Sequence, residues 1–254
     1  MAIVAIIPAR YGATRLPGKP LSDIHGRPMI QHVYERARRA RSVDRVLVAT
    51  EDQRIADAVR GFGGEAVMTS ARHASGTDRL AEAAAGLADT DIVVNVQGDE
   101  PMLDPAGIDA VVSAFDAKDV VMATVSLPLR DVADMTSVNV VKVVTNAAGD
   151  ALYFSRSPIP CVRDAAGPGG SAAAAVAQGL ARRHVGLYGY RRHALLRFAG
   201  WPPAPLEVAE GLEQLRAMFH GMAIRVVAME GEGGVAVDTQ DDLDKVRTLL
   251  AGGR

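Results

Sequence analysis

The sequence predicts a single α/β domain in which a mostly parallel sheet is flanked by helices, with a smaller extension toward the C-terminus. In roughly the first 118 residues, short β-branched runs alternate with stretches of helix length, which is the pattern of βαβ units. Beyond that point, strand-like runs follow one another without long helices between them. With 254 residues the chain is long enough for one large domain, which we expect to consist of two halves, residues 1–118 and 119–254.

Four strands are expected in the first half, at residues 3–7, 45–49, 66–68 and 92–96. The first helix is predicted by the apolar side chains of Ile30, Val33, Tyr34 and Ala37, whose spacing places them on one helix face. Asp104 as an N-cap and Pro105 at the first helical position predict another helix. A loop is therefore left at residues 97–103.

The second half carries further strand-like runs at residues 122–127, 138–144, 151–155 and 185–190. They predict either an antiparallel extension of the first sheet or a lobe that covers its mouth. Residues 164–181 are rich in Ala and Gly and predict a mobile loop followed by a short helix, to which we assign no chemistry. Thr239, with Asp242 three residues later, predicts the start of the last helix.

Composition excludes several classes of protein. The chain has 28 basic and 30 acidic residues, 48% hydrophobic and 23% charged residues, which are values of an ordinary globular protein. A net charge of −2 offers no general attraction for nucleic acid. Cys161 is the single cysteine and cannot form an intramolecular disulfide, the N-terminus lacks a secretory signal, and no apolar run approaches the ~18 residues of a membrane span. We therefore expect a cytoplasmic protein with neither a membrane nor a nucleic-acid partner.

The loop after the first strand is rich in cations. It contains Arg10, Thr14, Arg15 and Lys19 together with two glycines. Ligands of open α/β sheets bind beyond the carboxyl ends of the strands, where this loop must lie. Guanidinium and ammonium groups neutralise phosphate oxygens, and glycine lets the backbone approach them, so the loop is suited to a triphosphate. It matches neither a Walker A loop nor a GxGxxG fingerprint. The alternative is an exposed basic loop without a ligand, and the position after the first strand favours the phosphate interpretation.

Two carboxylates are candidate metal ligands. Asp99 follows the fourth predicted strand and is expected in the same crevice as Arg10 and Lys19, although a turn or cap residue is the commoner role for such an aspartate. Asp238 lies far along the chain and could equally be a strand-to-helix connector. Together they would supply oxygen ligands of the kind that Mg²⁺ shares with substrate phosphates.

Four stretches resemble one family in the same order. They are IIPARYGATRLPGKPL at 6–21, HASGTDRLAEA at 73–83, VNVQGDEPML at 94–103 and VDTQDDLDKVR at 237–247. These motifs are similar to those of the sugar-activating nucleotidyltransferases, and in detail to the 3-deoxy-manno-octulosonate (Kdo) cytidylyltransferase family. Further similarity at 151–160, 184–191 and 205–216 extends the resemblance over nearly the whole chain. One departure is Ala236, where the family usually has glycine.

The resemblance implies a Rossmann-like nucleotidyltransferase sheet, a nucleotide-binding first half, a sugar-binding and dimerisation second half, and a homodimer. It implies transfer of CMP from CTP to the anomeric hydroxyl of Kdo, an eight-carbon acidic sugar, with release of pyrophosphate for lipopolysaccharide synthesis. Asp99 and Asp238 would hold Mg²⁺, and Arg10, Arg15 and Lys19 would stabilise the leaving pyrophosphate. Glu100 also matches the motif, without an assigned role.

The same resemblance implies a nucleotide site that includes Arg10, Thr14, Arg15, Lys19, Arg72, Ser75, Gly76, Thr77, Gln97 and Asp99. From the residues alone, Thr77 is the expected N-cap of a helix, and the two roles can coexist because a helix N-terminus offers N–H groups to a ligand. The sequence does not determine the choice of cytosine over uracil.

The sugar site is expected from the second half together with Gln97. Glu207, Glu210 and Gln214 have the spacing of one helix face, which predicts either a solvated stripe or, by the resemblance, a polyol-binding face. His184 and Tyr188 are expected on one strand face as sugar contacts, with His184 not acting as a base. Arg156 is the candidate partner of the sugar carboxylate.

Two alternatives to this function stay open. One is activation of another acidic sugar, such as sialic acid or an amino analogue of Kdo, by the same chemistry. The other is a catalytically silent module that binds CTP as a sensor, against which the presence of both Asp99 and Asp238 argues.

Overall fold

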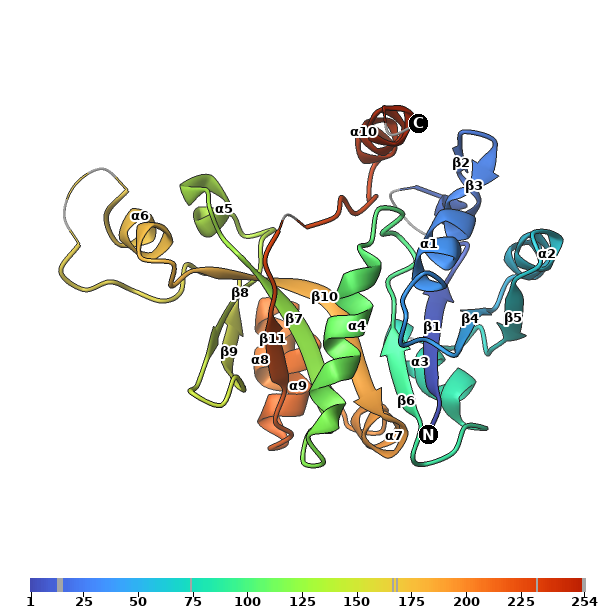
Figure 1. The fold of residues 1–254 in the computed structure, drawn as a ribbon, viewed down its shortest axis with the longest axis horizontal. Helices are drawn as coiled ribbons and strands as arrows, with labels where there is room; N and C mark the ends of the chain where they lie inside the picture. The colour runs from blue at the N-terminus through green and yellow to red at the C-terminus, as the bar shows by residue number, and fades with distance from the viewer. Residues whose placement is uncertain (13–15, 74, 166, 168, 232, 253–254) are drawn as a thin grey trace.

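The structure is a computed structural model that describes residues 1–12, 16–73, 75–165, 167, 169–231 and 233–252. Its centre is a mixed sheet in the order β11-β7-β10-β6-β1-β4-β5, to which β8 and β9 are attached through β10 (Figure 1). A separate small hairpin is formed by β2 and β3. The strands described are β1 Ile3–Ala9, β2 Asp23–Ile24, β3 Arg27–Pro28, β4 Arg45–Thr50, β5 Glu65–Met68, β6 Ile92–Asn95, β7 Met122–Pro128, β8 Lys142–Thr145, β9 Ala151–Ser155, β10 Arg182–Arg191 and β11 Arg225–Ala228.

Helices cover both faces of the sheet. The α-helices described are α1 Met29–Ala37, α2 Gln53–Gly61, α3 Gly76–Ala84, α4 Pro105–Ser113, α5 Val132–Thr136, α6 Gly170–Ala177, α7 Arg192–Ala199, α8 Pro205–Glu210, α9 Gln214–Phe219 and α10 Gln240–Ala251, with short 3-10 turns at Lys19–Leu21 and Ala114–Asp116. One face packs against α1, α2 and α4, and the other against α3, α7 and α9. None of the described helices is long and apolar enough to cross a membrane.

The first half of the sheet follows from alternation along β1. Ile3, Ala5 and Ile7 pack into the core on the α1 side, whereas Val4 and Ile6 pack on the α3 side. A strand buried on both faces reads as a continuous apolar run, which is why β1 has no polar residue over its first five positions. β1 pairs in parallel with β4 and β6, and β4 with β5, so the predicted parallel sheet is confirmed.

The second half extends the same sheet. β10 pairs antiparallel with β6 on one side and with β7 on the other, and β11 pairs in parallel with β7. The long strand β10 therefore joins the two halves by direct hydrogen bonds. Of the two predicted arrangements, the structure has the antiparallel extension.

Two sequence predictions are wrong in detail. The strand expected at 138–144 begins only at Lys142, and the residues before it form a turn. The buried Lys142 ammonium stabilises this turn, because it donates to the carbonyls of Ser137 at 2.9 Å and Val140 at 2.6 Å. The N-cap of α3 is Ser75, not Thr77: the Ser75 hydroxyl accepts from the N–H of Asp78, whose carboxylate accepts from the N–H of Ser75. This reciprocal capping box satisfies two otherwise unpaired N–H groups, which a cap at Thr77 would not do.

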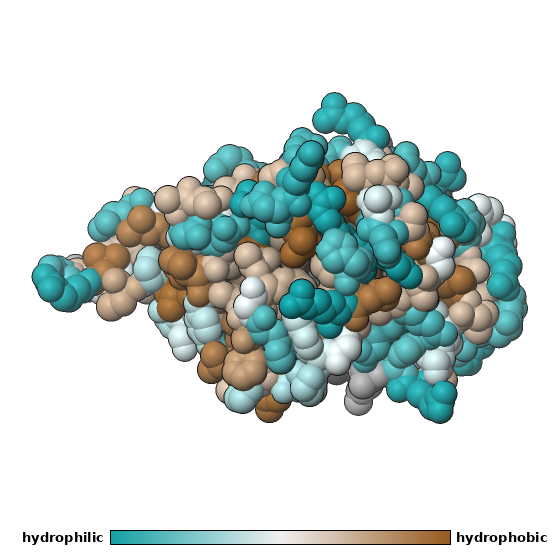
Figure 2. Space-filling model, turned by 90° about the horizontal axis from the view of Figure 1, so that it is seen from below, coloured by the Kyte–Doolittle hydropathy of each residue, from teal (hydrophilic) through white to brown (hydrophobic). Residues whose placement is uncertain are grey.

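The predicted helices after Asp104, within residues 164–181 and after Thr239 are present as α4, α6 and α10. Large apolar side chains are exposed on the second half, at Val138, Leu152, Leu180, Leu206, Val208 and Phe219. Figure 2 shows apolar patches among polar residues toward the end of the molecule that α6, β8 and β9 build.

Candidate active site

A cleft of about 330 Å³ opens at the carboxyl ends of β1 and β6. Four separate stretches of sequence line it: the end of β1 and the loop after it, the start of α3, the loop after β6, and the segment before α10. The lining residues are Pro8, Ala9, Arg10, Lys19, Pro20, His73, Ser75, Gly76, Arg79, Gln97, Gly98, Asp99 and Asp238.

Lys19 joins the two acidic stretches. Its Nζ lies 2.8 Å from Asp99 Oδ2 and 3.3 Å from Asp238 Oδ1, and donates to the carbonyl of Val237 at 2.9 Å. The N–H of Val237 donates to the carbonyl of Asp99 at 2.8 Å, which holds the two segments together. The structure thus brings to one point two carboxylates that are far apart in the sequence.

The cationic loop, which follows β1 and carries Arg10 and Lys19, is closed by a hydrogen bond between its two ends. The N–H of Gly18 donates to the carbonyl of Tyr11 at 3.0 Å, and Gly18 adopts a φ of 70°, a conformation that favours glycine. A Cβ at this position would lie 3.2 Å from the Tyr11 ring. The Arg54 guanidinium covers that ring at 3.4 Å from its centroid. Thr14 and Arg15, both predicted site residues, lie outside the described residues.

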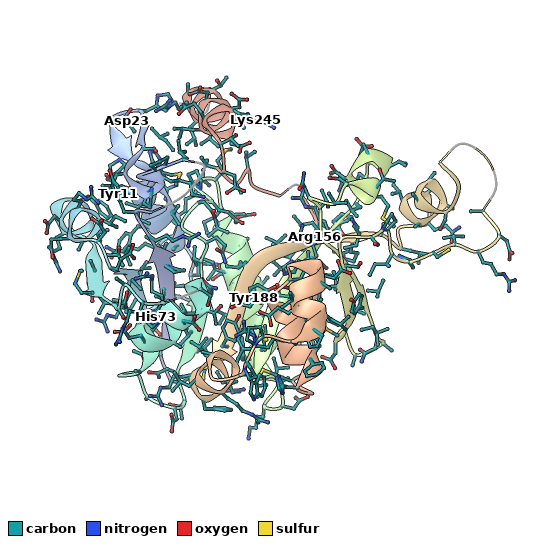
Figure 3. All side chains as sticks on the ribbon, turned by 180° about the vertical axis from the view of Figure 1, so that it is seen from behind. Tyr11, Asp23, His73, Arg156, Tyr188 and Lys245 are labelled. Carbon is teal, nitrogen blue, oxygen red and sulfur yellow. The ribbon has the colours of Figure 1, made fainter. Side chains whose placement is uncertain are left out.

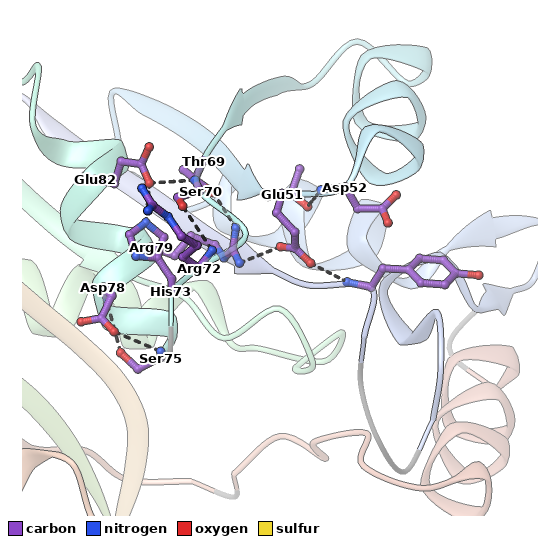
Figure 4. Close-up of polar contacts among 12 residues, drawn as sticks. Glu51, Asp52, Thr69, Ser70, Arg72, His73, Ser75, Asp78, Arg79 and Glu82 are labelled. Carbon is purple, nitrogen blue, oxygen red and sulfur yellow. Dashed lines mark hydrogen bonds and ion pairs between the residues drawn. The ribbon is translucent and has the colours of Figure 1, made fainter.

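A buried ion pair connects this loop with α3. The Arg79 guanidinium lies 2.7 Å from Glu51 Oε2 and donates to the Thr69 hydroxyl at 2.5 Å (Figure 4). Glu51 also accepts from the N–H of Tyr11 at 3.3 Å. Arg79 lines the cleft, so one buried guanidinium links the cleft wall at α3 to the start of the loop after β1.

The start of α3 places Ser75 and Gly76 in the lining, as predicted for the nucleoside side, but not Thr77. Thr77 is buried and donates from its hydroxyl to Glu213 Oε2 at 2.5 Å. Arg72 is exposed, and its neighbour His73 lines the cleft instead. His73 bonds to Glu82, which also accepts from the N–H of Ser70 at 2.9 Å (Figure 4). These two bonds lower the pKa of Glu82, the bond from Ser70 having the larger effect.

A second, smaller cavity of about 50 Å³ lies beside the cleft. It is lined by Asn95, Gln97, Tyr188, Tyr190, Phe198, Glu213 and Gln214. Gln97 lines both spaces, and its amide is held by a bond to the carbonyl of Gly186 at 3.2 Å. Figure 3 shows Tyr188 in the centre of the molecule, with His73 on the side of β1.

This small cavity contains unsatisfied polar groups. Asn95 Oδ1 and Gln214 Nε2 are buried, and within the described part of the chain neither has a hydrogen-bond partner. Glu213 also lines this cavity, and burial raises the pKa of its carboxyl group. Buried polar atoms without partners are costly, which indicates a place where a polar ligand belongs.

His184 lies between the aromatic rings of Phe154, at 5.1 Å, and Tyr188, at 5.3 Å between centroids. Its Nε2 is 3.1 Å from the hydroxyl of Thr124. Burial lowers the pKa of His184 to about 3, so the ring is neutral at physiological pH. His184 can therefore orient a neighbour but does not change its protonation state near neutrality.

The predicted polar helix face is wrong. The segment that carries Glu207, Glu210 and Gln214 is two helices, because α8 ends at Glu210, where Gly211 with φ 61° is the C-cap, and α9 begins only at Gln214. The Glu207 carboxylate is buried against Arg216, at 2.5 and 2.9 Å, and caps the N–H of Ala204. Glu210 accepts from the Ser155 hydroxyl at 2.8 Å and from the N–H of Arg156 at 2.9 Å. Of the three, Gln214 lines the small cavity.

The Arg156 guanidinium donates to three main-chain carbonyls, those of Glu210 (2.6 Å), Val138 (2.7 Å) and Gly211 (3.4 Å). These bonds clamp the turn between α8 and α9 to the β8–β9 hairpin. Its pairing with a sugar carboxylate stays a prediction.

Glu100, the neighbour of Asp99, titrates near neutrality. Burial, together with the negative charge of Asp99, raises the pKa of Glu100 to about 7, and the positive charge of Arg183 opposes this shift. Its carboxyl group is therefore partly protonated at physiological pH.

Several lining residues were not predicted from the sequence, among them His73, Arg79, Asn95 and Glu213. A signal existed for Asn95, which is the one polar residue in the apolar strand β6. His73, Arg79 and Glu213 lie in the stretches at 73–83 and 205–216 that carry the resemblance, but their spacing did not set them apart from the polar residues of a helix or loop, which are usually solvated.

Comparison with known proteins is consistent across methods. The cytidylyltransferase family matches residues 4–224. The 3-deoxy-manno-octulosonate cytidylyltransferase of Geobacter metallireducens is 54% identical over 252 residues, which cover 99% of this chain and 98% of the relative. That of Trichlorobacter lovleyi is 53% identical over 254 residues and the full length of both chains.

Among solved structures, CMP:2-keto-3-deoxy-manno-octonic acid synthetase complexed with CTP superposes with a TM-score of 0.89 at 44% identity over the full length of both chains. The 4-diphosphocytidyl-2C-methyl-D-erythritol synthase of Anaerococcus prevotii has a TM-score of 0.61 at 12% identity, covering 98% of each chain, and shares the fold alone.

Proposed function

The chain belongs to the 3-deoxy-manno-octulosonate cytidylyltransferase family of cytidylyltransferases, and from this we propose that it transfers CMP from CTP to the anomeric hydroxyl of Kdo, with release of pyrophosphate, for lipopolysaccharide synthesis. The observation that carries the proposal is the meeting of Lys19, Asp99 and Asp238 at one end of the cleft. A cation beside two carboxylates, at the carboxyl ends of parallel strands, is suited to a metal-bound triphosphate.

We propose that CTP lies in the cleft with its phosphates toward Arg10 and Lys19 and its nucleoside toward Ser75 and Gly76. Arg10 is exposed at the end of β1, so its guanidinium can reach a phosphate without breaking an internal contact. The α3 N-terminus supports the nucleoside side, because Ser75 and Gly76 line the cleft and the first N–H groups of a helix have no partner within the helix. Thr14 and Arg15 are included in this proposal because their motif resembles that of the family. Arg72 and Thr77 do not line the cleft, and we propose no direct contact between them and CTP.

The donor set fits a divalent metal, which we propose to be Mg²⁺. Asp99 and Asp238 supply hard carboxylate oxygens, and among the described residues no larger group of metal-ligating side chains surrounds them. Mg²⁺ commonly takes one or two protein carboxylates and completes its shell with phosphate oxygens and water. When bound, the ion would neutralise negative charge on the phosphate oxygens.

The chain's own residues account for the rest of the catalysis. The Kdo hydroxyl oxygen forms a bond to the α-phosphorus in line with the bond that breaks to pyrophosphate, and the proton of that hydroxyl passes to solvent. No covalent intermediate with the protein is needed. Lys19 and Arg10 stabilise the charge that accumulates on the leaving pyrophosphate. Gln97, held by Gly186 and lining both spaces, orients the two substrates where they meet.

We propose the small cavity, with Gln97, as the start of the sugar site. Asn95 and Gln214 offer unpaired polar atoms to sugar hydroxyls, and Glu213 offers a carboxyl group. Tyr188 lines the cavity, and neutral His184 packs against it as a positioning contact. Glu207 and Glu210, already bonded internally, support the turn that presents Gln214. The exposed apolar side chains of the second half support a homodimer through that half.

Pyrophosphate release tests this function directly. We expect release with CTP, Mg²⁺ and Kdo together, and not when UTP replaces CTP or sialic acid replaces Kdo. Activity with sialic acid or an amino analogue, but not with Kdo, would retain the cleft and replace the sugar assignment. CTP binding without release under any sugar would favour a sensor.

Substitution of a metal ligand tests the mechanism. Asp99→Asn should lower kcat by ~10²–10⁴-fold while the Kd of CTP changes much less, because the carboxylate acts mainly in the transition state. The exposed Asp119→Asn is the matched control and should be active as wild type. A nearly unchanged kcat for Asp99→Asn would exclude the metal role.

A further inference from the structure

A basic cavity of about 280 Å³ lies apart from the cleft, between the β2–β3 hairpin, α1 and α10. It is lined by His25, Arg27, His32, Glu35, Arg36, Arg39 and Leu250. None of these residues belongs to the lining of the cleft or of the small cavity. Neither the proposed reaction nor the motifs in the sequence account for this group of side chains.

Positive charge exceeds negative charge in the basic cavity. Three guanidinium groups line it with one carboxylate, and Glu35 is already paired with Arg27 at 3.1 Å. The positive charges of Arg36 and Arg39 repel each other. Burial has the largest effect in lowering the pKa of Arg36, the repulsion by Arg39 lowers it further, and the nearby Asp104 offsets only part of this shift. The concave wall therefore holds like charges close together without an equal number of anions.

The two histidines have their orientation fixed by main-chain carbonyls. His25 Nε2 lies 2.7 Å from the carbonyl of Arg247, and His32 Nε2 lies 3.0 Å from the carbonyl of Ile24. A carbonyl only accepts, so each Nε2 carries the proton and donates it. Each ring is thereby held in one tautomer at the wall of the cavity.

The walls of the basic cavity are preformed. The Arg247 guanidinium donates twice to the carbonyl of Asp23, at 2.9 and 2.7 Å, which binds α10 to the hairpin. Arg36 donates to the carbonyl of Leu103 at 3.4 Å. Beneath the hairpin, Ile24, Met29, Leu243 and Val246 form a small buried core. An anion would enter a space whose main-chain walls are already in place, so that only exposed side chains such as Arg39 have to be ordered on binding.

We propose that the basic cavity is a second anion site, which binds a small polyphosphate such as inorganic pyrophosphate or the phosphate chain of a nucleotide. Guanidinium forks match phosphate oxygens in pairs, and Arg36 in the last turn of α1 and Arg39 just beyond that helix can contact successive phosphate groups. The volume is close to that of the proposed nucleotide cleft, which is ample for two or three phosphates. The site does not depend on the proposed reaction.

Histidine-ring NMR distinguishes the two sites, because His25 and His32 line the basic cavity whereas His73 lines the cleft. Inorganic pyrophosphate is titrated, without metal, into a full-length Lys19→Ala variant, in which binding at the cleft is weakened. We expect the ring resonances of His25 and His32, assigned with His25→Gln and His32→Gln, to shift together and to saturate. Shifts confined to His73, or no shifts at all, would overturn the proposal.

Arg39→Ala provides the substitution test, with the adjacent exposed Arg38→Ala as the matched control outside the cavity. Arg39→Ala should weaken the Kd of pyrophosphate at least tenfold, and Arg38→Ala less than twofold. Equal weakening by both would mean a general attraction of the basic segment after α1 for anions and would overturn the site. Inorganic sulfate at matched ionic strength should bind at least tenfold more weakly; equal affinity would overturn the assignment to polyphosphates. Pyrophosphate release from CTP and Kdo is measured separately, so either proposal can fail alone.

Discussion

Gly98 controls the distance between the two strands that carry the proposed active site. It lies three residues after β6, between Gln97 and Asp99, and a Cβ added to it would lie 2.8 Å from the carbonyl oxygen of Pro8 in β1. That oxygen belongs to the backbone of a central strand, so it cannot rotate away as a side chain does. Gly98→Ala should therefore push the loop that carries Asp99 away from β1.

The size of the effect follows from this contact. Ordinary contacts of a Cβ begin at 3.4 Å, so a clash at 2.8 Å requires a displacement of about 0.6 Å. A misplacement of ~1 Å in an active site can cost ~10²-fold in rate, so we expect a loss of ~10-fold in kcat/KM. Overpacking should also lower the free energy of unfolding by ~1–3 kcal/mol, which leaves the protein folded at 25 °C.

Pyrophosphate release at 25 °C and thermal unfolding measure the two effects. The control is Gly61→Ala at the end of α2, where an added Cβ meets nothing within 4 Å. This control should keep wild-type kcat/KM. If Gly98→Ala keeps kcat/KM within twofold of wild type, then the close approach of the loop to β1 does not position Asp99, and the reasoning is refuted.

Three further predictions concern the support of the site. Arg216→Met should lower the Tm by ~6–20 °C, because it leaves the Glu207 carboxylate buried without its guanidinium partner. As the control, Arg45→Met breaks the exposed pair with Glu65 and should lower the free energy of unfolding by ~1 kcal/mol or less. Equal decreases in Tm for the two variants would contradict this prediction. His184 has a pKa of about 3 when folded and ~6.5 when unfolded, so the unfolded state alone gains a proton as pH falls below 6.5, and wild type should lose up to ~1.4 kcal/mol of stability per pH unit from this residue. His184→Gln should not show this loss, and a stability difference between the two proteins that stays constant in urea titrations from pH 7 to pH 5 would exclude it. Glu51→Gln removes the negative charge that pairs with Arg79 and also accepts from the Tyr11 N–H. We expect the KM of CTP to rise ~10-fold with little change in the KM of Kdo. An equal rise in both KM values would argue against a specific link between this ion pair and the loop after β1.

Much of the fold was predictable because its signals are local. The apolar run of β1 and the spacing of Ile30, Val33 and Tyr34 report the period of their own element. The caps at Asp104 and Thr239 satisfy N–H groups within three residues. The cationic loop was placed correctly because the carboxyl end of a parallel strand has a known location.

Local signals were less reliable where two neighbours compete for one role. Ser75 and Thr77 are both good caps, and only the reciprocal bonds with Asp78 decide for Ser75. The spacing of Glu207, Glu210 and Gln214 fits one helix, but Gly211 interrupts it. A glycine is tolerated in a helix or ends it according to the surrounding packing, which the spacing does not contain.

Residues close together in the sequence predicted the α/β class, most of the elements, and the residue types of the proposed phosphate and metal site. Only the tertiary structure decided that β10 lies between β6 and β7, that Lys19 draws Asp99 and Asp238 together, and that Arg156 and Glu207 are bonded inside the fold. The physical reason is that period and capping depend on residues a few positions apart. The partner of a charged side chain depends instead on segments that meet only when the sheet is complete, because burial makes each such group take whichever partner the packing brings within reach.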